Sequence, residues 1–113
     1  MKMIRAVIRP EKEETVVEAL AKAGFPALTK TDITGRGRQR GIQVGSALYE
    51  ELAKVQIMIV VDDAKAEQAI KVIMEAGKTG NFGDGKLFVS PVEEAYTIRT
   101  GNREESLSAV AGR

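Results

Sequence analysis

The chain has 113 residues, the size of one domain, with neither a signal peptide nor the roughly 18 apolar residues of a membrane span. We therefore expect a cytoplasmic protein that does not insert into a membrane. The 17 Lys+Arg and 16 Asp+Glu residues leave a net charge of +1, which gives no reason to expect nucleic acid as the main partner. Cysteine and histidine are both absent, so disulfides and thiolate metal sites are excluded, and histidine-dependent hydrolysis or zinc chemistry is disfavoured.

The first third of the chain predicts two strands around one helix. Residues 3–9 are β-branched and partly alternating, and they stop at Pro10, which is typical of a strand followed by a helix start. Acidic residues after Pro10 and apolar residues at helical spacing predict a helix that ends near Ala23. The β-formers within residues 27–33 predict a second strand, closed by Gly35.

A long segment without periodicity follows, at about residues 36–52. It is polar and rich in glycine, and no helical or strand pattern fits it. A compact domain seldom keeps so long a loop without using it, so we expect this loop to be functional.

The second half of the chain again predicts strand, helix and strand. Residues 53–61 are an apolar β-branched run, and apolar residues at helical spacing follow as far as Gly77. Residues 86–90 and 95–100 are both strand-like, whereas residues 102–113 indicate a flexible tail.

This order predicts an α+β domain with the ferredoxin-like βαββαβ sandwich, in which both helices cover one face of an antiparallel sheet. The sheet would also be apolar on its other face, where Met3, Val7, Met58 and Val60 lie. A face exposed to water is normally more polar, so another subunit is expected to cover it.

Three segments could bind an anion. Residues 35–41 combine glycines, which allow close backbone approach, with arginines, whose forked donors suit phosphate or carboxylate. Residues 79–86 form a glycine-rich turn that ends in Lys86, where backbone N–H groups can cradle an anion. Arg99 lies at the end of the last predicted strand. Taken singly, residues 35–41 could instead be a solvated basic loop or an RNA contact, residues 79–86 a tight turn, and Arg99 a solubilising side chain. Together the three segments would supply several cations to one polyphosphate.

The same residues resemble a known family. Residues 79–89 match the C-terminal signature of the PII signal-transduction proteins, the glycine and arginine loop matches their loop base, and residues 98–101 match their closing segment. The likeness covers residues 1–101. It implies a trimer with sheets packed inward and with clefts between subunits that bind ATP or ADP, each topped by a long loop that contacts target proteins.

The resemblance also implies a ligand set, in which the nucleotide carries Mg²⁺ held with the help of Gln39 and 2-oxoglutarate chelates that metal. Lys54 would pair with the distal carboxylate of 2-oxoglutarate. The residues carried over for the nucleotide are Thr29, Gly35, Gly37, Arg38, Gln39, Val60, Gly83, Asp84, Gly85, Lys86 and Arg99, and those for 2-oxoglutarate are Gln39, Arg40, Gly41 and Lys54.

The altered loop looks most like the nitrogen-fixation-associated PII branch, whose members regulate nitrogenase. Tyr49 does not stand at the position of the tyrosine that relatives modify, so it does not inherit that role. The branch implies a homotrimer or a mixed oligomer with a second PII-like subunit, and dinitrogenase as target; the alternative within the family is an ammonium channel.

Two other classes of function remain as alternatives. A weak ATP-hydrolysing enzyme would need a base, and Asp84 is the one well-placed carboxylate. An RNA-binding ferredoxin-like module would need aromatic residues on its central strands, where only Phe88 is available. We therefore expect a regulatory module and not an enzyme.

Overall fold

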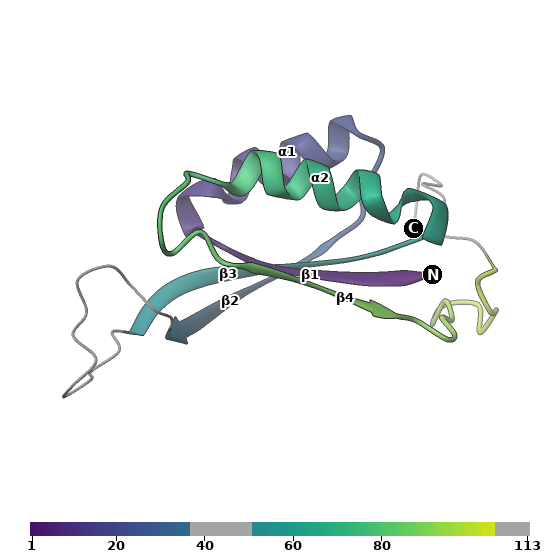
Figure 1. Ribbon diagram of the computed structural model, residues 1–113. Coiled ribbons are helices and arrows are strands. Elements are labelled where there is room, and N and C mark those ends of the chain that lie inside the picture. Colours follow the sequence, from purple (N-terminus) through teal and green to yellow (C-terminus); the bar gives the residue numbers. More distant parts are fainter. Residues whose placement is uncertain (37–50, 106–113) are drawn as a thin grey trace.

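The computed structural model describes residues 1–36 and 51–105 of the chain (Figure 1). The elements within these ranges follow the predicted order of strand, helix, strand, strand, helix and strand. They are β1 (Lys2–Ile8), the 3₁₀ turn η1 (Pro10–Lys12), α1 (Glu13–Lys22), β2 (Thr29–Arg36), β3 (Glu51–Val61), the 3₁₀ turn η2 (Asp63–Lys65), α2 (Ala66–Gly77) and β4 (Lys86–Pro91).

The four strands form one antiparallel sheet in the order β2-β3-β1-β4. Ile4 of β1 pairs with Ile59 of β3 on one side and with Val89 of β4 on the other. Both helices lie on the same face of the sheet (Figure 1). This arrangement confirms the predicted ferredoxin-like α+β sandwich.

The core lies between the helices and the sheet. Val16 and Leu20 of α1 are fully buried, as the helical spacing of the apolar residues predicts. Gly77 ends α2 against α1, where an added Cβ would lie 3.5 Å from Val16 Cγ2, so the two helices pack closely. No helix within the described ranges is both long and apolar enough to cross a membrane. The other buried apolar side chains within the described ranges are those of Ile4, Ala6, Ile8, Phe25, Val55, Ile57, Ile59, Val61, Ala66, Ala69 and Ile73.

The other face of the sheet carries no helix, and we call it the open face. Strand alternation places Met3, Val7, Met58, Val60 and Phe88 on it, opposite the buried core. Phe88 is 56% exposed. Arg5 lies on the same face, paired with Met58 and Phe88, so the apolar side chains surround a charged one. Exposed apolar side chains gathered on one face are typical of an interaction site.

Two strands are longer than predicted. β2 begins at Thr29 rather than residue 27 and runs through Gly35 to Arg36, and β3 begins at Glu51 rather than residue 53. Arg36 pairs with Glu51 across the two strands, with its Nη2 atom 2.9 Å from Oε1. This cross-strand ion pair favours extension of the ladder into sequence that looks like a polar loop.

The prediction of a strand at residues 95–100 is wrong. The backbone there turns back on itself: Thr97 N donates to Asn102 O at 2.9 Å, and Gly101 N donates to Thr97 O at 2.7 Å. Gly101 adopts a φ of 73°, which glycine permits readily. The segment therefore forms its hydrogen bonds within a local hairpin, in which Tyr96 forms an isolated β-bridge with Arg103.

Candidate functional site

The glycine loop, residues 79–85, joins α2 to β4 and is organised around Asp84. The backbone N–H groups of Thr79 and Gly80 both donate to Asp84 Oδ2 at 2.8 Å, and Thr79 Oγ1 donates to Oδ1 at 2.6 Å. The Thr79 hydroxyl, then Arg9 and these backbone donors, hold the pKa of the Asp84 carboxyl well below its usual range. Asp84 is thus ionised and fully occupied by contacts within the protein.

Arg9 ties the glycine loop to the end of β1. Its Nε atom donates to Asp84 Oδ1 at 2.9 Å, and its Nη2 atom donates to the Phe82 carbonyl oxygen at 2.7 Å. The Arg9 side chain is only 23% exposed. A single planar guanidinium therefore fixes two points of the loop at once.

Gly85 lets the loop approach β1 more closely than any other residue would allow. Its φ is 99°, and an added Cβ would lie 1.7 Å from the Val7 carbonyl oxygen. Gly83 also has a positive φ, of 98°, and its Cβ would lie 3.1 Å from Arg9 Nη2. Side chains at these two positions would push the loop away from the sheet.

Lys54 of β3 reaches the same loop from the open face. Its Nζ atom donates to the Gly83 carbonyl oxygen. Burial lowers the pKa of the Lys54 ammonium, and the nearby Arg9 charge lowers it further, while Glu11 and Asp84 act in the opposite direction. Lys54 and Arg9 thus hold neighbouring carbonyls of the glycine loop.

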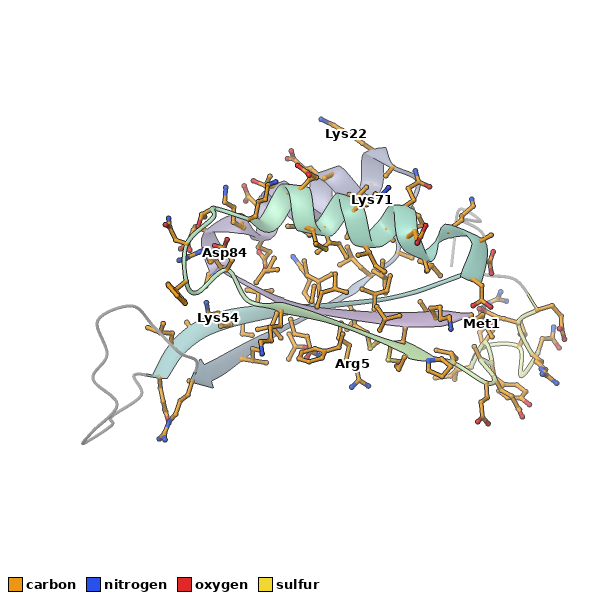
Figure 2. All side chains as sticks on the ribbon, viewed as in Figure 1. Met1, Arg5, Lys22, Lys54, Lys71 and Asp84 are labelled. Atoms are coloured by element: carbon orange, nitrogen blue, oxygen red, sulfur yellow. The ribbon has the colours of Figure 1, made fainter. Side chains whose placement is uncertain are left out.

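Lys54 and the residues from Asn81 to Lys86 help to line a pocket of about 600 Å³ at one end of the sheet. Figure 2 shows Lys54 and Asp84 at this end, with Met1 at the opposite end. The volume lies in the range typical of small-molecule sites. The pocket brings together six residues of the predicted site, namely Gly35, Lys54, Gly83, Asp84, Gly85 and Lys86.

Other predicted site residues lie elsewhere in the chain. Thr29 and Val60 are on β2 and β3, paired with Met58 and Met3, and they do not line the pocket. The predicted nucleotide, 2-oxoglutarate and metal residues Gly37, Arg38, Gln39, Arg40 and Gly41 lie outside the described residues, as does Tyr49.

Arg99 belongs to the C-terminal hairpin, residues 95–105, at the far end of the sheet. Val92 N donates to Met1 O, which joins the chain just before this hairpin to the start of β1. The glycine loop contacts the other end of β1, and a strand of seven residues spans about 20 Å at ~3.3 Å per residue. Ile98 is 99% exposed in this hairpin. A single chain therefore keeps Arg99 away from its own pocket.

Comparison with known proteins identifies the family. The family model described as nitrogen regulatory protein P-II matches residues 1–102. The chain belongs to the PII family. Proteins of this family are regulators that act on target proteins. Membership therefore agrees with the expectation of a regulatory protein and not an enzyme.

Individual relatives place this PII protein in one branch. It is 61% identical over 107 residues to "Nitrogen fixation nifHD region GlnB-like protein 1" of Methanothermobacter marburgensis, covering 95% of this chain and 100% of that protein. It is 58% identical over 100 residues to a protein of the same name from Methanococcus maripaludis, covering 88% and 95%. It is 43% identical over 107 residues to "Nitrogen regulatory protein P-II" of Azospirillum brasilense, covering 91% and 96%. The expected likeness to the nitrogen-fixation branch is confirmed.

Sequence reasoning missed Arg9. It looks like the polar end of a strand, and its partner Asp84 lies 75 positions away, so no local spacing links the two. One available signal was the cost of burying an arginine at the end of an apolar strand, since such a side chain normally has a partner. In this PII protein that partner is Asp84 of the glycine loop.

Proposed function

We propose that this PII protein binds ATP or ADP in clefts between subunits, together with Mg²⁺ and 2-oxoglutarate, and thereby controls dinitrogenase through its long loop. The observation that carries the proposal is the pocket where the glycine loop, Lys54 and Lys86 converge. Glycine backbone with positive φ and lysine ammonium groups are the features that cradle phosphates. The cytoplasm is the setting in which these ligands occur.

The charges of one chain support a site shared between subunits. Arg9 is neutralised by Asp84, and Arg36 is paired with Glu51. Lys54 and Lys86 are then the cations that remain for a ligand among the described pocket residues. Two ammonium groups are few for a triphosphate, which favours a further cation from another chain. Arg99 is exposed and remote from its own pocket, so it suits this role.

The open face supplies the surface for such an assembly. Its half-buried and exposed apolar side chains, among them Met58, Val60 and Phe88, would be covered if sheets of several copies packed inward. A homotrimer, or a mixed oligomer with a second PII-like subunit, would bring the hairpin of one chain to the pocket of the next. Thr29 and Val60 would then line the base pocket from the neighbouring sheet.

Lys54 is the residue of the described chain best suited to an acid ligand. Its ammonium currently bonds a neutral carbonyl, so a carboxylate would be a stronger partner. In the proposal it pairs with the distal carboxylate of 2-oxoglutarate, while Gln39, Arg40, Gly41 and the nucleotide-bound Mg²⁺ hold the other end. Because the proposed Mg²⁺ joins the nucleotide to 2-oxoglutarate, each ligand should strengthen the other's binding, and by the same factor.

The proposed target comes from the relatives. Several carry names that place them in a nitrogen fixation nifHD region. We extend this to a nitrogenase-regulating role, in which the ADP-bound protein inhibits dinitrogenase and ATP with 2-oxoglutarate releases it. Co-purification of dinitrogenase with the full chain in ADP, and its loss in ATP plus 2-oxoglutarate, supports this target. Capture of an ammonium channel instead contradicts it.

Calorimetric titration of ATP, with and without 2-oxoglutarate, tests the sensing step. The expected result is tighter ATP binding in the presence of Mg²⁺ and the acid. Lys54→Met should abolish the effect of the acid and should also weaken the binding of ATP alone, because it removes one of the two pocket ammonium groups. Lys71→Met, on the outer face of α2, should change neither (Figure 2). An ATP affinity that the acid leaves unchanged contradicts the sensing mechanism, and absence of any adenylate binding contradicts the whole proposal.

A further inference from the structure

The peptide planes of the glycine loop are oriented by cations beneath them. Arg9 Nη2 holds the Phe82 carbonyl, and Lys54 Nζ holds the Gly83 carbonyl. All peptide bonds of the described chain are trans, so the C=O and N–H of each peptide point in opposite directions. The N–H groups of Gly83 and Asp84 therefore point away from the two cations.

Those two N–H groups are available as donors. Within the described residues, Gly83 N has no hydrogen-bond acceptor, and Asp84 N has only the Asn81 carbonyl of the turn at Phe82 and Gly83, in a contact weaker than a full hydrogen bond. Gly83 and Gly85 both adopt left-handed φ values, which is the conformation that gathers successive N–H groups into an anion-binding concavity. The loop is thus set for an anion before any ligand arrives.

Arg9 is the residue that couples both halves of this arrangement. Its Nε atom donates to Asp84, whose carboxylate in turn accepts from the N–H groups of Thr79 and Gly80 at the start of the loop. Its Nη2 atom donates to the Phe82 carbonyl near the tip. A lysine has one donor atom in place of the fork and cannot span both acceptors. With its charge neutralised by Asp84 and its donors engaged, Arg9 is poorly placed to attract a phosphate directly.

We propose that Arg9 is a positioning residue for the nucleotide site: acting through Asp84 and the Phe82 carbonyl, it holds the Gly83 and Asp84 amides in the orientation that binds phosphate. The inference rests on the proposed nucleotide-binding function. It assigns Asp84 the same indirect role, because its two carboxylate oxygens already accept four hydrogen bonds from Arg9, Thr79 and Gly80.

Nucleotide affinity separates positioning from simple charge attraction. Asp84→Asn removes a negative charge beside the phosphates, so charge attraction alone predicts tighter ATP binding, whereas positioning predicts weaker binding. We expect Arg9→Lys and Asp84→Asn each to weaken ATP binding about tenfold, the effect of losing a charged hydrogen bond. Lys22→Met, at the exposed end of α1, removes a charge far from the loop and serves as the control (Figure 2).

The amide resonances of the ligand-free protein provide an independent readout. We expect Arg9→Lys to move the ¹H–¹⁵N signals of Gly80, Gly83 and Gly85, while Lys22→Met leaves them in place. If wild-type protein binds no ATP, the proposed function fails, yet these shifts still test whether Arg9 sets the loop. Wild-type ATP affinity in Arg9→Lys, tighter binding in Asp84→Asn, or unmoved loop signals would overturn the inference.

Discussion

The glycine loop and the C-terminal hairpin are both short, glycine-containing segments, but they are held in different ways. The glycine loop has its own bonds to Asp84 but is also fixed from outside, by Arg9 at the end of β1, by Lys54 of β3 and by contact of Gly85 with Val7. The hairpin is held by bonds among its own residues, such as Thr97 Oγ1 to Glu104 Oε1 at 2.8 Å.

This difference indicates how the proposed site is divided. The fold of one chain already sets the glycine loop, so the phosphate-binding half needs no partner to form. The hairpin projects Ile98 and Arg99 into solvent, where they contribute nothing to their own chain's pocket. The second half of the site is then completed only when another copy presents its hairpin.

Replacing Gly85 in the glycine loop should have the largest effect on stability. Gly85→Ala adds a Cβ 1.7 Å from Val7 O at a φ of 99°, and we expect it to lower the free energy of unfolding by about 3 kcal/mol or more. Gly80→Ala is the matched control, because its φ is 90° but nothing lies within 4 Å of the added Cβ. It should cost about 1 kcal/mol, from backbone strain alone. Denaturant unfolding measures both, and equal losses would contradict the close approach.

A charge on the open face should dissociate the subunits and thereby remove the hairpin of one chain from the glycine loop of the next. Met58→Lys would place an ammonium within the proposed subunit interface, where burial without a partner is costly. We expect sedimentation to show the mass of one chain for this variant and of three for the wild type, with helical and strand content unchanged. Met74→Lys, on the 57% exposed Met74 of α2, should stay assembled. A monomeric wild type would refute the assembly.

Removing the cation of the hairpin should weaken nucleotide binding without affecting the fold. Arg99→Met should reduce ATP affinity about tenfold or more, as expected for the loss of a charged hydrogen bond, and should leave the unfolding midpoint unchanged. Arg103→Met removes a charge from the same hairpin and should leave ATP affinity near the wild-type value. Calorimetry on both variants compares them; equal affinities would mean that Arg99 only adds charge to the surface.

The smallest expected effect concerns the pH dependence of stability. The pKa of Asp84 is lowered in the folded chain, so its contribution to stability is complete above the ordinary carboxyl pKa of about 4 and is lost as pH falls toward the folded value. The difference in free energy of unfolding between wild type and Asp84→Asn should therefore shrink between about pH 5 and pH 2. Glu14→Gln, an exposed change on α1, is the control. A pH-independent difference would contradict the ionised Asp84.

Sequence reasoning predicted the fold because apolar spacing is local. The helical period around Val16 and Leu20 and the apolar run of β3 were enough to define the layers. The prediction for residues 95–100 failed for the opposite reason. Their β-formers suggest a strand, but the hydrogen bonds of Thr97 and Gly101 close a local hairpin instead. Local propensity does not report which partner a backbone finds.

The candidate site was predictable in part. The residues Gly83 to Lys86 stand out as a motif, and the structure gathers them with Gly35 and Lys54 in one pocket. The motif did not reveal that Asp84 faces inward, or that Arg9 holds it, because that contact joins residues 75 positions apart. Roles that depend on tertiary contacts require the structure.

The central claim is that each nucleotide site takes its glycine loop from one chain and its hairpin from another. It can be tested by refolding a mixture of Arg99→Met and Lys86→Met chains, each of which should bind ATP poorly alone. In mixed oligomers some clefts would combine the intact Lys86 of one chain with the intact Arg99 of the other, so calorimetry should recover a fraction of sites with wild-type affinity. If mixing restores no tight site, both cations act from the same chain and the shared site is wrong.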